Sequence, residues 1–156
     1  MADVKKIMVA VDESECSHYA LEWTLNNLYL YRKDDSIPSL VVLHVQPFVT
    51  ISGAGTMGVT PPELVEVLVN QQKQFSEALL ARAKDICTQK NVTVDTMAEM
   101  GDPKDTICDV VEKKKIDLLV VGSHGYGMVK RALMGSVSGY CVNHAKCPVL
   151  VVRKPS

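Results

Sequence analysis

The sequence lacks the features of several special classes of protein. No stretch approaches the ~18 consecutive apolar residues of a membrane-spanning helix. The N-terminal segment has only a short apolar run, so we interpret it as a first strand and not as a signal peptide. The 17 Lys and Arg residues are balanced by 18 Asp and Glu, so we expect no basic face for nucleic acid. We therefore expect a cytoplasmic protein that binds neither membranes nor nucleic acids.

A disulfide framework is also missing. The five cysteines are odd in number and irregular in spacing, which is typical of free thiols in a reducing compartment. Cys141, His144 and Cys147 are ligand-type residues three apart, a spacing that places them on roughly one face of a helix. No fourth ligand is evident, so small thiols packed in a core are favoured over a metal site.

The usual catalytic signatures are absent as well. The sequence has no G-x-x-x-x-G-K-[ST], no H-E-x-x-H and no G-x-S-x-G, which disfavours a Walker-type motor or kinase, a zinc hydrolase and a serine hydrolase. One G-x-G-x-x-G occurs, at Gly53–Gly58, but it neither follows a strand directly nor opens a helix, as a dinucleotide fingerprint requires. We interpret it as a flexible loop, with a lid over a ligand as one role, and that role stays open.

Apolar runs do alternate with amphipathic segments along the chain. Strands that alternate with helices predict an α/β fold, here a three-layer open parallel five-stranded sheet with helices on both faces. The length suits a single domain over residues 1–156. The predicted strands are 4–11, 40–45, 92–100, 117–122 and 148–152. The first predicted helix is capped by Ser14 or Asp12 and runs to Tyr31. The others are 63–90, 103–115 with Asp102 as its cap, and 136–145.

The segment from Gly122 to Ser138 carries the main functional signal. Gly122 ends an apolar strand, Gly125 follows three residues later, and Gly135-Ser136 come after nine intervening residues. Glycines let the backbone approach a phosphate, and the amides of Gly135, Ser136 and Val137 would open the last helix toward it. An ordinary surface loop is the alternative that spacing alone leaves open. Further candidate phosphate contacts are the hydroxyls of Ser136 and Ser138 and the side chains of Lys130 and Arg131.

Four other side chains are also candidates. Asp12 follows the first strand, where a carboxylate can accept hydrogen bonds from ribose hydroxyls or cap the next helix. His44 lies within an apolar strand, which favours a satisfied core histidine. His124, on the glycine-rich loop, either flanks the ligand or faces solvent. His144 is interpreted as a surface residue.

Several segments together resemble the universal stress protein family over essentially the whole chain. They are VAVDES (9–14), LHV (43–45), GDPKDTI (101–107), DLLVVGSHG (117–125), GS (135–136) and CPVLVV (147–152). The pattern G-x-x-G, nine residues, G-[ST] is similar to the signature of the family's ATP-binding branch. The start MADVKKIMVAVDESE and the segment VNHAKCPV look most like the plant single-domain members.

The resemblance implies a strand order of 3-2-1-4-5 in a Rossmann-like, adenine nucleotide alpha hydrolase-like fold. It also implies a site. Asp12 would contact the ribose or the adenine edge, with Ala10 and Val11 beside it, and the backbone of Val45 would bind adenine. Gly122 and Gly125 would meet the ribose and phosphate, and Gly135, Ser136 and Val137 would bind the phosphates. Ala10 stands where similar proteins have a proline. The family usually forms homodimers through the last strand, here Val149, Leu150, Val151 and Val152.

Three functions follow as alternatives. The first is a nucleotide-dependent regulatory module of the stress response that binds ATP or AMP and is sensed by a signalling partner. The second is a slow ATP hydrolase that uses Mg²⁺. The third is a chaperone-like scaffold in which the nucleotide is structural. The first is favoured because binding groups are present while no base is placed beside the phosphates, so no catalytic residue is assigned.

Overall fold

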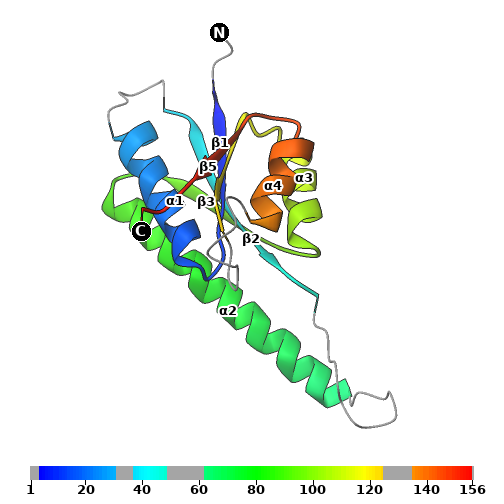
Figure 1. The fold of residues 1–156 in the computed structure, drawn as a ribbon. Helices are drawn as coiled ribbons and strands as arrows, with labels where there is room; N and C mark the ends of the chain where they lie inside the picture. Colours follow the sequence, from blue (N-terminus) through cyan, green and yellow to red (C-terminus); the bar gives the residue numbers. More distant parts are fainter. Residues whose placement is uncertain (1–3, 31–36, 49–61, 125–134, 156) are drawn as a thin grey trace.

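The computed structural model describes residues 4–30, 37–48, 62–124 and 135–155. Strands and helices alternate along the chain (Figure 1). In order, the elements are β1 (Lys6–Ala10), α1 (Glu15–Thr24), the π-helical segment η1 (Leu25–Tyr29), β2 (Ser39–Gln46), α2 (Pro62–Gln89), β3 (Val94–Met100), α3 (Pro103–Lys113), β4 (Leu118–Gly122), α4 (Ser136–His144) and β5 (Val149–Val152). No helix in these four ranges is both long and apolar enough to cross a membrane.

The five strands form one parallel sheet in the order β3-β2-β1-β4-β5, which confirms the predicted fold class. In β1, Ile7 pairs with Leu40 of β2 on one side and with Leu118 of β4 on the other. The chain leaves β3 at one edge and re-enters the sheet beyond β1, so the strand order reverses between β1 and β4. Ligands bind parallel sheets at the carboxyl ends of the strands beside such a reversal.

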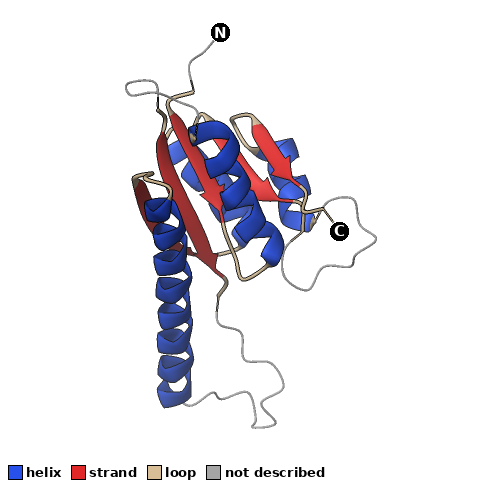
Figure 2. Cartoon of the chain, turned by 90° about the vertical axis from the view of Figure 1, so that its left-hand side faces the viewer, coloured by secondary structure: helices blue, strands red, loops and turns tan. Residues whose placement is uncertain are grey.

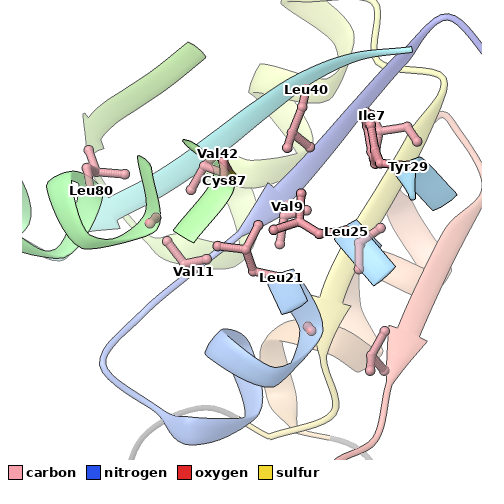
Figure 3. Close-up of a cluster of buried hydrophobic side chains, with 14 of the residues drawn as sticks. Ile7, Val9, Val11, Leu21, Leu25, Tyr29, Leu40, Val42, Leu80 and Cys87 are labelled. Atoms are coloured by element: carbon pink, nitrogen blue, oxygen red, sulfur yellow. The ribbon is translucent and has the colours of Figure 1, made fainter. Parts of the chain in front are cut away.

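Each face of the sheet has its own buried core. Alternate residues of β1 divide between the two faces, with Ile7 and Val9 packing under α1 and α2 and Met8 packing under α3 and α4. Figure 3 shows the first of these cores, in which Leu21 lies against Val9 and Val11. Because both faces are covered, the sequences of the central strands are continuous apolar runs, without alternation of apolar and polar residues. Figure 2 shows the resulting layers.

The first helix differs from its predicted extent. The regular helix ends at Thr24, and the next five residues, Leu25–Tyr29, form a π-helical segment instead of continuing to Tyr31, which lies outside the described residues. The Thr24 hydroxyl donates to the Ala20 carbonyl at 2.8 Å, and the Leu30 amide donates to the Leu25 carbonyl at 3.1 Å. A threonine that bonds back into its own helix competes for the backbone acceptors, which favours this local widening.

Candidate functional site

A cavity of about 310 Å³ lies at the carboxyl ends of β1, β2 and β4, where the strand order reverses. The starts of α3 and α4 complete its walls. Nine of the predicted site residues line it: Ala10, Val11, Asp12, Val45, Gly122, Gly135, Ser136, Val137 and Ser138. The other three, Gly125, Lys130 and Arg131, lie outside the described residues, as does the Gly53–Gly58 segment.

The first turn of α4 faces this cavity without a side-chain cap. Gly135 is the N-cap residue and has no side chain with which to accept a backbone N–H. The Ser138 hydroxyl lies 3.0 Å from the Ser123 carbonyl and 3.1 Å from the Gly135 carbonyl, and it donates to them. Its hydrogen is therefore used within the protein. The Gly135 amide, predicted to face a phosphate, instead donates to the Ser123 carbonyl. The amides that follow it in the first turn keep their partial positive charge, which suits an anion.

The loop between β1 and α1 forms the opposite wall and is held by its own hydrogen bonds. Ser14, and not Asp12, is the N-cap of α1, because its side chain accepts from the Ser17 amide at 3.2 Å. One Asp12 carboxylate oxygen, Oδ1, accepts from the Ser14 amide at 2.8 Å. The buried Ser17 hydroxyl donates to the Asp12 carbonyl at 2.9 Å. Asp12 thus organises the turn through Oδ1, while Oδ2 has no hydrogen bond to the described residues and can accept from a ligand.

A third wall is apolar. Leu43 and Val45 from β2, Ile107 from α3 and Val137 from α4 line the cavity between the other two walls, and Pro103 lies beside them. The first three of these side chains are buried. An apolar wall between a carboxylate and an anion-binding helix start can hold a flat ring by contact alone. Ile107 and Pro103 were not predicted as site residues, because only the tertiary packing of α3 brings them to this site.

His44 is a satisfied core histidine, as predicted, and it also lines the cavity. Its Nδ1 lies 2.7 Å from the hydroxyl of Ser76, a fully buried residue of α2. Burial lowers the pKa of His44 below its usual value, and the nearby carboxylates of Glu13 and Asp12 oppose that effect. The neutral imidazole is therefore favoured, and α2 is tied to the floor of the site.

Two buried polar atoms beside the cavity lack partners among the described residues. They are the Oγ of Ser123 and the Nδ1 of His124, and His124 lines the cavity. Buried polar atoms are nearly always hydrogen-bonded, so an unpaired one beside a cavity fits a site that a ligand completes. Of the two interpretations of His124, this favours the ligand-facing one.

The predicted cluster at the end of α4 lies away from the cavity. His144 is exposed, stacks on Tyr140 with ring centroids 4.0 Å apart, and has its Nδ1 2.9 Å from the Tyr140 carbonyl. Burial raises the pKa of Cys141 to about 12, so its thiol stays protonated. Within the described ranges, no group of three or more His, Cys, Asp or Glu side chains is arranged to hold a metal ion.

Gly122 has a role that the sequence did not reveal. A Cβ at this position would lie 2.9 Å from both the carbonyl carbon and the carbonyl oxygen of Cys16, and 3.1 Å from the Ser17 amide. These are backbone atoms at the start of α1, which do not yield easily. Gly122 therefore lets α1 pack closely on β4, whatever it also offers to a ligand.

Sequence comparisons place the chain among known proteins. Residues 3–153 match the Universal stress protein family. The chain is 33% identical to a universal stress protein A-like protein of Arabidopsis thaliana over 162 aligned residues, which cover 96% of this chain and 90% of the relative.

Solved structures agree with the sequence comparison. A universal stress protein family protein from Arabidopsis thaliana, solved with AMP bound, is 29% identical with a TM-score of 0.70, and the match covers 97% of this chain and 93% of that one. UspA from Lactobacillus plantarum is 26% identical with a TM-score of 0.73, covering 98% and 100% of the two chains. The chain therefore belongs to the universal stress protein family.

Proposed function

We propose that the cavity binds an adenine nucleotide, ATP or AMP, and that the protein acts as a nucleotide-dependent regulatory module of the stress response. The observation that carries the proposal is the uncapped start of α4, which faces a cavity with an apolar wall. The AMP-bound Arabidopsis structure, 29% identical to this chain, supports the choice of ligand. The spacing from Gly122 to Ser136 supports membership of the ATP-binding branch of the family.

Each wall of the cavity suits one part of such a ligand. The amides of Ser136 and Val137 would hold phosphate oxygens at the positive end of α4. The free oxygen of the Asp12 carboxylate would accept from ribose hydroxyls. The apolar wall around Val45 and Ile107 would contact the purine. The unpaired Nδ1 of His124 adds a polar group that a ligand can satisfy.

Calorimetric titration of the full chain with AMP, ADP and ATP, with and without Mg²⁺, tests the proposal. Gly135→Val should weaken binding at least a hundredfold, because its side chain would point into the space that the phosphate needs. The Gly135 backbone, at φ −72° and ψ 167°, suits any residue. Because the position is buried, the unfolding temperature of Gly135→Val is measured beside its affinity. Gly139→Ala is the matched control on the same helix: its Cβ meets no atom within 4 Å, and affinity should stay at the wild-type value. Wild-type affinity in Gly135→Val would overturn the proposal.

A turnover assay separates the regulatory module from a slow hydrolase. For the module we expect ATP to raise the unfolding temperature without release of phosphate above background. Hydrolysis that Ser136→Ala abolishes would identify an enzyme instead. Protection of an aggregating client protein that ignores nucleotide would identify a scaffold.

The proposed assembly is a homodimer through β5. This strand lies at one edge of the described sheet and pairs with β4 alone. Val149, Leu150 and Val151 are all partly exposed there. An apolar edge strand is a ready site for pairing with a two-fold mate. We expect Val151→Lys to shift the protein toward monomer in sedimentation experiments, and an unchanged mass would remove β5 from the interface.

A further inference from the structure

Helix α2 is much longer than the sheet that it covers. Its C-terminal half packs into the core and buries Ser76, Leu79, Leu80, Ala83 and Cys87. None of the residues described from Pro62 to Phe75 is buried. Figures 1 and 2 both show this part, which we call the projecting half of α2, extending past the carboxyl ends of the strands, away from the other described helices. At ~1.5 Å per residue its length is about 20 Å.

The projecting half exposes several large apolar side chains. Residues 64–69 read LVEVLV, with a single charge among five apolar side chains. Leu64 is 43% exposed, Val67 50% and Phe75 47%. Large apolar side chains exposed close together on one helix mark an interaction site.

The pattern of these residues favours another helix as the partner. Leu64, Leu68, Gln71 and Phe75 recur at spacings of four, three and four, which is the seam of a coiled coil. The charged residues of the projecting half lie outside the seam: Glu66 and Lys73 fall on the opposite side of the helix, and Glu63 is about 100° away from Leu64 around the helix axis. The side that carries the seam therefore has no charge to oppose close packing.

We propose that the projecting half of α2 pairs with the same segment of a second copy of this chain, antiparallel about a two-fold axis between Val69 and Asn70. In that register Leu64 meets Phe75 of the second copy, and Leu68 meets Gln71 of the second copy. The seam is thus complementary to itself, as a two-fold interface requires. Because only about four turns of helix take part, the interface is small and the association weak, with a dissociation constant of roughly micromolar order.

The proposed interface also adjoins the cavity. The Phe75 ring at the inner end of the seam lies edge-on to the His44 ring, with centroids 6.2 Å apart and an interplanar angle of 63°. His44 lines the cavity. The pairing concerns a surface separate from the β5 edge, so the two interfaces can be tested independently.

Sedimentation of the full chain at concentrations from about 1 to about 200 µM, a range that spans the expected affinity, tests the pairing. Leu68→Lys should raise the dissociation constant at least tenfold. Asn70→Lys adds the same charge to the same helix but outside the seam, and it should leave the dissociation constant unchanged. Leu68 is only partly buried in the fold, and circular dichroism and the unfolding temperature check that both variants keep it. Equal association of the two variants, or a wild-type chain that is monomeric throughout, would overturn the proposal.

A second experiment tests the antiparallel register of the proposed pairing. Leu68→Lys and Gln71→Glu should each associate poorly alone, but a mixture should form heterodimers, because the antiparallel register puts the introduced lysine of one chain against the introduced glutamate of the other. A parallel pairing would set position 68 against position 68 and give no such gain. A mixture no better associated than its components would therefore contradict the proposed pairing, while leaving the nucleotide site and the β5 edge unaffected.

Discussion

Helices α1 and α4 begin at the same edge of the sheet, but their first turns are completed differently. The Ser14 side chain accepts from the Ser17 amide and closes the first turn of α1. At Gly135 no side chain caps α4. Asp102 caps α3 in the way that Ser14 caps α1. Two of the three helix starts around the cavity thus have a side-chain cap, and the third has none, which suits the proposed anion.

Gly122 and Gly135 lie at the two ends of the predicted nucleotide-binding segment, and they differ in the same way as the two helix starts. Gly122 lies against the backbone of Cys16 and Ser17, so its missing side chain serves the packing of α1. Gly135 has an ordinary backbone conformation, and its missing side chain leaves the start of α4 open. A sequence motif that spans both glycines therefore combines a requirement of the fold with a proposed requirement of the ligand.

The largest effect on stability should come from the glycine on the α1 side. Gly122→Ala places a Cβ 2.9 Å from the Cys16 carbonyl group, and forced packing of this kind costs about 2–3 kcal/mol. Urea unfolding of Gly122→Ala measures the loss. Gly139→Ala provides the comparison, since an unobstructed alanine in a helix should raise the stability by about 0.5–1 kcal/mol. A Gly122→Ala protein as stable as the wild type would show that α1 can move away from β4 at little cost.

Variants of the two helix starts should separate an effect on stability from an effect on binding. We expect changes about half as large as that of Gly122→Ala. Ser14→Ala removes the side-chain acceptor of α1 and should lower the free energy of unfolding by about 1 kcal/mol, with little change in nucleotide affinity. Ser136→Ala should do the opposite, because Ser136 is exposed at the start of α4 and lines the cavity. Urea unfolding and calorimetry on both variants give the four values needed. Equal losses of stability in the two variants would remove the distinction between the helix starts.

The sequence predicted the order of the elements because that order depends on local signals. Apolar runs marked the strands around Val9 and Val120, and Asp102-Pro103 marked the start of α3, which the structure reproduces. Helix ends were predicted less well where a side chain competes for the backbone, as Thr24 does in α1.

The candidate site was predicted in part for the same reason. Glycines and an aspartate after strands are visible in a sequence, so the predicted residues around Asp12 and Gly135 do meet at one cavity. The contribution of Ile107 was not visible, because it depends on how α3 packs across the sheet. The reason for Gly122 was equally hidden, since the atoms that exclude its side chain belong to Cys16, more than a hundred residues away in the chain.

The smallest expected effect is a pH dependence of stability that belongs to the α1 side of the cavity. That side carries Asp12, Glu13 and His44, whereas Gly135–Ser138 on the α4 side carry no titratable side chain. Burial lowers the pKa of His44 in the folded protein. The unfolded chain therefore binds more protons between the folded-state pKa and the ordinary value of 6.5. Stability is then complete above about pH 6.5 and falls as the pH drops below it.

Urea unfolding from pH 5 to pH 8 should show this fall in the wild type and a shallower fall in His44→Gln, which keeps a polar side chain beside Ser76 but cannot titrate. The slope should not vanish, because the pKa of His18 on α1 is also lowered, by burial and by the nearby Arg82. Ser136→Ala should keep the wild-type slope, since it changes only the α4 side. An identical slope in the wild type and in His44→Gln would mean that protonation of His44 does not destabilise the fold, and that its tie to Ser76 tolerates an imidazolium ring.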